Sequence, residues 1–74
     1  MALVRRLEAQ TLERDTHHTD VECTYSVLDG QFLQIDTYGS NKRKIQGKKS
    51  QTIRFAPEAV KQLKSLLNRH FSDV

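Results

Sequence analysis

Hydrophobic and polar residues alternate in the middle of the chain. Over residues 21–27 every second residue is apolar, and over residues 33–37 Leu33 and Ile35 alternate with Gln34 and Asp36. A period of two is typical of strands that have one buried face. The pattern therefore predicts two strands here, and a third, shorter strand over residues 51–55.

The turn between the first two strands decides which residues share a face. A loop of two residues, Asp29 and Gly30, would place the apolar residues of the two strands on opposite faces. A loop of three residues places them on one face and pairs Tyr25 with Leu33. We therefore predict a type I turn with Gly30 in a left-handed G1 bulge.

The C-terminal residues have the clearest pattern of all. Pro57 suits the first position of a helix, and Glu58 lies in the first turn, where the helix dipole favours an acid. Ala56 is a poor N-cap residue. Apolar residues and one histidine recur at helical spacing and form the predicted buried stripe: Val60, Leu63, Leu66, Leu67, His70 and Phe71.

These elements predict an α+β fold, an antiparallel strand meander followed by one C-terminal helix that covers one face of the sheet. Residues 20–74 form a single domain in this interpretation. Residues 1–19 have a weaker pattern, which fits a first strand, an arm that clasps a dimer or a frayed tail.

The length of the chain bears on its stability. A chain of 74 residues buries only about 60% of its unfolded surface, so a dimer is expected. No apolar stretch approaches the roughly 20 residues of a membrane span, and the first residues lack the apolar core of a secretory signal. Cys23 is the only cysteine, which excludes an internal disulfide and favours a cytoplasmic location.

Charge is unevenly distributed along the chain. The net charge is +3, from 12 basic and 9 acidic residues. Residues 1–36 contain 3 basic and 7 acidic residues, whereas residues 37–74 contain 9 basic and 2 acidic residues. The second half is therefore the place to look for a polyanionic partner.

Residues 37–57 contain six cations and no carboxylate. Lysine and arginine contact phosphates, and aromatic rings stack on unpaired bases, so this combination is typical of proteins that bind single-stranded nucleic acid without strong sequence preference. The candidate binding residues are Tyr38, Lys42, Arg43, Lys44, Lys48, Lys49 and Arg54.

Three alternatives remain open for this segment and its surroundings. The cations can simply solubilise a loop and protect an edge strand. The chain can be a protein-interaction module or regulatory subunit that acts through the acidic residues between positions 8 and 22. Binding of duplex DNA is the third alternative, although it needs side chains that read bases.

Other chemistry has less support. His17, His18 and Cys23 suggest a metal site, but a structural zinc site needs four ligands at recurring spacing, so no metal or other cofactor is expected. Cys23 is interpreted as a small buried apolar residue. No glycines frame a nucleophilic serine, and we expect no enzymatic activity.

The chain also resembles a known family over about residues 21–70. Three stretches are similar to the C-terminal domain of the positive-cofactor family of single-stranded-DNA-binding transcriptional coactivators: residues 30–36, the basic loop closing on residues 47–49, and residues 57–64. The resemblance implies a homodimer formed largely through the C-terminal helices, with curved sheets that present basic and aromatic residues to unpaired strands. By position, Lys48 and Lys49 match the family's basic pair, and Tyr38 lies nearest its stacking aromatics.

Overall fold

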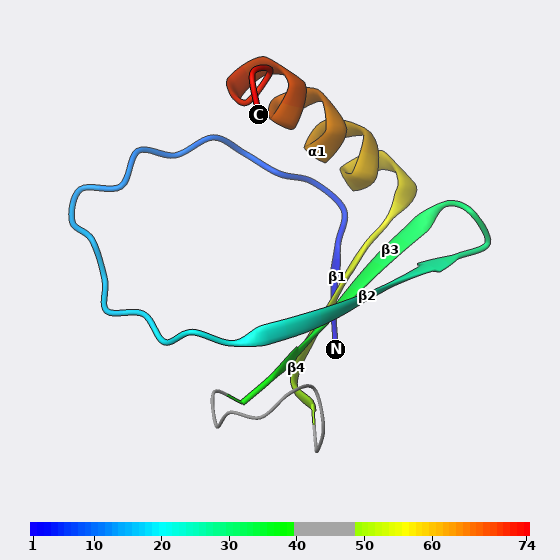
Figure 1. Cartoon of the computed structure of the whole chain (residues 1–74). Coiled ribbons are helices and arrows are strands. Elements are labelled where there is room, and N and C mark those ends of the chain that lie inside the picture. The colour runs from blue at the N-terminus through cyan, green and yellow to red at the C-terminus, as the bar shows by residue number, and fades with distance from the viewer. Residues whose placement is uncertain (40–48) are drawn as a thin grey trace.

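The computed structural model describes residues 1–39 and 49–74 of the chain. Four strands precede one helix (Figure 1). In chain order they are β1 (Ala2–Val4), β2 (Glu22–Leu28), β3 (Phe32–Tyr38), β4 (Lys49–Phe55) and α1 (Pro57–His70). The predicted α+β class is confirmed, and β4 begins two residues earlier than the sequence indicates.

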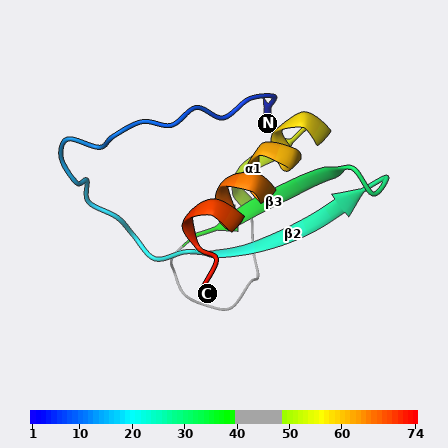
Figure 2. The same ribbon diagram turned by 90° about the horizontal axis from the view of Figure 1, so that it is seen from above.

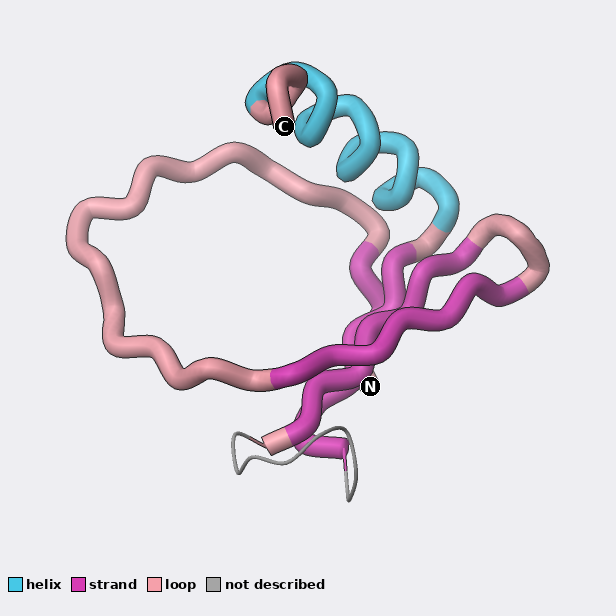
Figure 3. Tube along the Cα trace, viewed as in Figure 1, coloured by secondary structure: helices cyan, strands magenta, loops and turns pink. Residues whose placement is uncertain are grey.

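The strands form one sheet in the order β1-β4-β3-β2. β2, β3 and β4 are the predicted antiparallel meander, whereas β1 pairs with β4 in parallel. β1 and β2 are consecutive in the chain but lie at opposite edges of the sheet. Residues 5–21 connect the two edges as a wide arc without helix or strand (Figure 3).

The hairpin between β2 and β3 has a three-residue loop, but not the predicted one. Tyr25 pairs with Ile35 instead of Leu33, so the predicted register is wrong by two residues, while the apolar residues do share one face. The φ angles of Asp29 and Gly30 are 56° and 67°. Positive φ at two successive residues is typical of a type I′ turn, not the predicted type I, and it matches the right-handed twist of the strands.

The register sorts the side chains of the strands onto two faces. One face, here called the apolar face, carries no charged residue over β1, β2, β3 and residues 51–55 of β4: Ala2, Val4, Cys23, Tyr25, Val27, Leu33, Ile35, Thr37, Gln51, Ile53 and Phe55. The other, here called the polar face, carries most of the charged and hydrogen-bonding side chains. The two classes of residue are therefore separated across the thickness of the sheet.

The first turn of α1 is the most buried part of the protein. Ala56 and Ala59 are the buried apolar residues of the described chain, both 0% exposed. The Ala56 N–H donates to the carbonyl oxygen of Val4 at 2.9 Å, which extends the contact between β1 and β4. Ala56 is thus an N-cap residue without a side-chain cap, and it is fully buried at this junction.

Beyond its first turn, α1 diverges from the strands (Figure 1), and seen from above it lies over β3 (Figure 2). Its main contacts are with β3 and β4. Tyr25 and Val27 on β2 consequently remain 75% and 61% exposed. Within the described residues, no large side chain is fully buried.

The burial of the predicted helical stripe is only partly confirmed. Val60, Leu63 and Leu66 are partly buried, but Leu67 and Phe71 are 46% and 53% exposed. His70 is exposed as well, so it is not packed within the chain. The prediction that Cys23 is buried is also wrong, because its thiol is exposed. Cys23 belongs to the edge strand β2, and its side chain is on the uncovered apolar face.

Candidate nucleic-acid interface

Four side chains of the polar face form a continuous hydrogen-bond network. Arg54 donates to Oε1 of Gln34 through Nε, at 3.0 Å, and through Nη2. The Gln34 Nε2 donates to the two carboxylate oxygens of Asp36 at 3.2 and 3.3 Å. The Thr52 hydroxyl donates to Oδ1 of Asp36 at 2.7 Å. The network thus joins two neighbouring strands.

Strand geometry explains how these residues meet. Gln34 and Asp36 are two positions apart on β3, so they project from the same face. In the register of β3 with β4, Gln34 lies opposite Arg54 and Asp36 lies opposite Thr52. Directly opposed residues have Cβ atoms about 5 Å apart, within reach of a side-chain hydrogen bond.

The network leaves the charge of Arg54 uncompensated among the described residues. Its guanidinium donates to a neutral amide oxygen, and the ion pairs of the described chain are Arg5 with Glu58 and Arg6 with Glu8. Asp36 is only 4% exposed and is surrounded by donors. On the polar face, the Arg54 guanidinium is therefore fixed by hydrogen bonds to Gln34, whereas the Asp36 carboxylate is buried.

Three of the predicted binding residues lie on described strands. Tyr38 ends β3 on the side of Gln34 and Asp36, and it is partly buried. Lys49 opens β4 opposite Tyr38, next to an irregularity in the ladder. Arg54 pairs with Gln34 instead, about 13 Å along β3 from Tyr38 at 3.3 Å per residue. The strand register thus pairs the backbone positions of Tyr38 and Lys49 and places Arg54 further along the sheet.

The other four predicted residues are Lys42, Arg43, Lys44 and Lys48, and they lie outside the described residues. In the chain, residues 40–48 lie between β3, which ends at Tyr38, and β4, which begins at Lys49.

Sequence reasoning missed Gln34 and Thr52 as partners of the site. The alternation in residues 33–37 already places Gln34 and Asp36 on one face. Their partners on β4 depend on the pairing of β3 with β4, which the amino-acid pattern alone does not specify.

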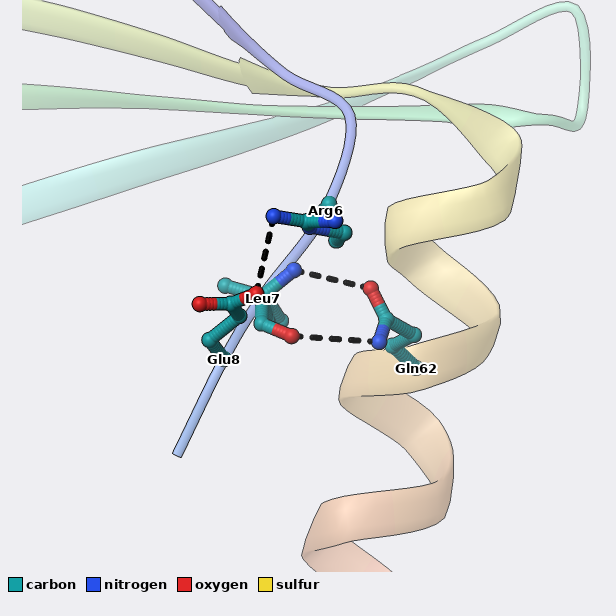
Figure 4. A network of polar contacts seen from close by, with 4 residues as sticks. All are labelled: Arg6, Leu7, Glu8 and Gln62. Carbon is teal, nitrogen blue, oxygen red and sulfur yellow. Dashed lines mark hydrogen bonds and ion pairs between the residues drawn. The ribbon is translucent and has the colours of Figure 1, made fainter. Parts of the chain in front are cut away.

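A second set of polar contacts attaches the N-terminal segment to α1 (Figure 4). The Leu7 N–H donates to Oε1 of Gln62 at 2.8 Å, and Nε2 of Gln62 donates to the Leu7 carbonyl at 3.1 Å. One turn earlier, Arg5 Nη1 lies 3.3 Å from Oε2 of Glu58. Residues 5–7 are therefore held along the helix, whereas residues 8–20 are exposed throughout.

The pKa of Glu58 is lowered from its ordinary value of 4.5. A hydrogen bond with its own backbone N–H is the largest cause, loss of water contact opposes it, and the Arg5 guanidinium lowers the pKa further. Both effects that lower the pKa favour the charged carboxylate at the start of the helix.

Neither a metal-binding cluster nor a membrane-spanning helix occurs among the described residues. Residues 1–39 and 49–74 contain no group of three or more His, Cys, Asp or Glu side chains arranged to hold a metal ion. In the same part of the chain, α1 is neither long enough nor apolar enough to cross a membrane.

No protein-family model matches the chain, and no curated protein or solved structure matches it. The resemblance to the positive-cofactor family therefore remains a prediction from the residues quoted for it.

Proposed function

We propose that this protein binds single-stranded nucleic acid, without strong sequence preference and without catalysis, through the polar face of its sheet and the adjoining basic segment. The observation that supports this proposal most directly is the state of Arg54. Its guanidinium is held by the neutral amide of Gln34 and forms no ion pair among the described residues.

A guanidinium held in this way suits a phosphate ligand. The hydrogen bonds to Gln34 use Nε and Nη2, which leaves the remaining N–H groups of Arg54 for an anion. Asp36 on the same face is almost fully buried and accepts hydrogen bonds from Gln34 and Thr52. It forms no ion pair with Arg54, whose guanidinium therefore stays available for an anion.

The other end of β3 adds an aromatic ring, and the ladder partner of this residue is a lysine. Tyr38 and Lys49 are opposite each other at the point where residues 40–48 join the sheet. The chain of a single-stranded ligand has a phosphate at each nucleotide and bases that stack on aromatic rings. A path along β3 from Arg54 to Tyr38 would span about two nucleotides at the roughly 6–7 Å spacing of an extended strand, which fits contact of phosphate at one end and base at the other.

Fluorescence anisotropy of labelled oligo-dT, measured over a series of salt concentrations, tests the proposal. We expect binding at low salt that weakens as salt rises, because cations on the protein displace counterions from the phosphates. Competition with duplex DNA of equal length distinguishes single-strand from duplex binding. Absence of binding at low salt would refute the proposal.

A matched pair of double variants then locates the site. Lys48→Gln with Lys49→Gln removes two charges from the proposed site, and Lys61→Gln with Lys64→Gln removes two from the exposed surface of α1. The first variant should reduce the slope of log K against log salt by about 1.4, at roughly 0.7 per single-strand phosphate contact. The second should leave the slope nearly unchanged, and equal effects would place the site elsewhere.

A protein-interaction module or regulatory subunit is the second candidate function. The exposed apolar face favours it, because such surfaces commonly mark contacts with other proteins. A partner retained at high salt, together with an absence of oligonucleotide binding, would support this candidate over the first.

We also propose that the functional unit is a homodimer to which the C-terminal helix contributes. The exposed apolar side chains Leu67 and Phe71 support a contact at this end of the helix. A molar mass of one chain at all concentrations would contradict it.

A further inference from the structure

The accessible surface of the chain is larger than that expected for a compact monomer of the same mass. It measures 6522 Å² at a mass of 8.6 kDa. A folded monomer of this mass is expected to expose about 4,700 Å², so the excess is roughly 1,800 Å². Part of the excess belongs to the exposed residues 8–20, and part to apolar side chains of the sheet and helix.

The apolar face of the sheet holds a substantial part of this uncovered surface. Tyr25 is 75% exposed, Val27 61% and Ile53 38%. A shallow hollow of about 410 Å³ lies on this face, with Ile35 and Ile53 among its lining residues. Leaving such a surface in water is unfavourable, because burial of apolar area is the main favourable term in folding.

We propose that a second copy of this chain docks on the apolar face of the sheet, face to face, around Tyr25, Val27 and Ile53. This inference rests on the homodimer proposed above and names a surface for it, but it does not depend on nucleic-acid binding. It leaves both polar faces on the outside of the dimer.

Two features of the structure favour a second copy over another occupant. No large side chain in the described chain is fully buried, so the fold needs a partner over the apolar face whenever it is folded. A second copy of the same chain is present wherever the protein is made. Over β2, β3 and residues 51–55 of β4 the apolar face also carries no charged residue, so two copies that each have a net charge of +3 can meet there without burying charge from these residues.

A stable dimer of this kind needs an interface of a known size. A standard interface buries about 800 Å² on each partner, and obligate homodimers bury 2,000 Å² or more in total. Isologous contacts of this kind pair the same patch on both chains, as a self-complementary face requires.

Sedimentation equilibrium over a range of concentrations, on three single variants, tests this surface. Val27→Lys places a charge on the apolar face, and Ser26→Lys places it at the neighbouring exposed position on the polar face of the same edge strand. We expect the native chain and Ser26→Lys to be dimeric. Val27→Lys should weaken dimerisation by about a hundredfold or more, because two ammonium groups per dimer would lose water.

The third variant separates failure of this surface from failure of the homodimer itself. Leu67→Lys alters the exposed apolar part of α1. If Leu67→Lys dissociates the dimer and Val27→Lys does not, the helix forms the interface and the apolar face does not. If the native chain is monomeric, both the homodimer and this surface are overturned.

Cys23 provides a measurement on the unmodified chain, which matters if Val27→Lys fails to fold. Its thiol is exposed and lies on the apolar face with Tyr25 and Val27. We expect its reaction rate with a thiol reagent to fall at least several-fold as protein concentration rises through the dimerisation range. A rate that is the same in monomer and dimer would overturn the proposed surface.

Discussion

Gln62 holds Leu7 by both ends of its side-chain amide, accepting from the Leu7 N–H at 2.8 Å and donating to the Leu7 carbonyl at 3.1 Å. This is the pattern of a backbone partner in a β-ladder, supplied here by a helix. The contact of Gln62 with Leu7 extends the ordered path of β1 by three residues beyond Val4. Gln62 therefore marks the point at which the N-terminal segment separates from α1.

Replacing this glutamine should release the segment without unfolding the helix. Gln62→Met keeps the length and helical propensity of the side chain but removes both hydrogen bonds. Exchange of the Leu7 amide hydrogen should become several-fold faster, because each such bond contributes about 1 kcal/mol. The Val60 amide, which donates to Ala56 within α1, is the internal reference and should not change.

Gln62→Glu is the matched control for this experiment. It keeps the acceptor for the Leu7 N–H and loses the donor to the Leu7 carbonyl. Its effect on Leu7 exchange should therefore lie below that of Gln62→Met. Protection of Leu7 that is unchanged in both variants would show that Gln62 does not hold the segment in solution.

The contact between Arg5 and Glu58 makes attachment of the segment depend on pH. Because the pKa of Glu58 is lower in the folded protein than its ordinary 4.5, the charged carboxylate stabilises the fold. This contribution is present above pH 4.5 and is lost as the pH falls through the lowered value. The amide chemical shift of Arg5, followed by NMR during acid titration, should therefore move in this range, and the change should be smaller in Glu58→Gln.

Arg5→Gln tests which interaction lowers the pKa of Glu58 the most. The hydrogen bond with the backbone N–H of Glu58 is a larger cause of the lowered pKa than Arg5. The variant should therefore raise the pKa of Glu58 only part of the way to 4.5. A return to the full ordinary value would assign the whole effect to Arg5.

The elements that local chemistry determines could be predicted from the sequence. The helix was predicted from Pro57 because proline fixes φ at a first helical position, and the alternation over residues 21–27 correctly placed Tyr25 and Val27 on one face. The hairpin register was wrong because Asp29 adopts a positive φ, which moves the loop to residues 29–31.

Features that depend on distant contacts were not accessible from the sequence pattern. Ala2–Val4 forms a strand because β4 offers an edge and Ala56 donates to Val4, although three residues carry almost no periodic signal. The exposure of Leu67 and Tyr25 has the same origin, since helical spacing identifies an apolar stripe but not the angle at which the helix leaves the sheet. Arg54 was predicted as part of the candidate site from its charge alone. Its partner Gln34 could be identified only from the pairing register of β3 with β4.

Removal of the Thr52 hydroxyl should destabilise the fold. Thr52 donates to the buried Asp36 at 2.7 Å. Thr52→Val keeps the shape of the side chain and its preference for strands, but it leaves this buried carboxylate with one donor fewer, at a cost of about 1–3 kcal/mol in the free energy of unfolding. Urea denaturation measures the change.

Thr52→Ser is the companion variant, because it keeps the hydroxyl and loses only a methyl group. It should cost less than Thr52→Val. The reverse order would mean that packing of the methyl group, not the hydrogen bond to Asp36, is what Thr52 contributes.

Arg54 should contribute to nucleic-acid affinity through both its charge and its fixed geometry. Arg54→Gln removes the charge, and we expect weaker oligo-dT binding with a salt slope reduced by about 0.7. Arg54→Lys keeps the charge but loses the planar fork that Gln34 holds at Nε and Nη2. It should preserve the slope and still weaken binding at every salt concentration.

Arg69→Gln, in the last turn of α1, is the matched control for loss of one guanidinium away from the polar face. Its affinity and salt slope should stay close to those of the native chain. If Arg54→Gln and Arg69→Gln reduce the slope equally, the protein attracts nucleic acid by its overall charge and Arg54 has no particular role. If only Arg54→Gln does so, the hydrogen bonds that Arg54 donates to Gln34 have a role in binding, because they hold the guanidinium on the polar face in the position from which it meets a phosphate.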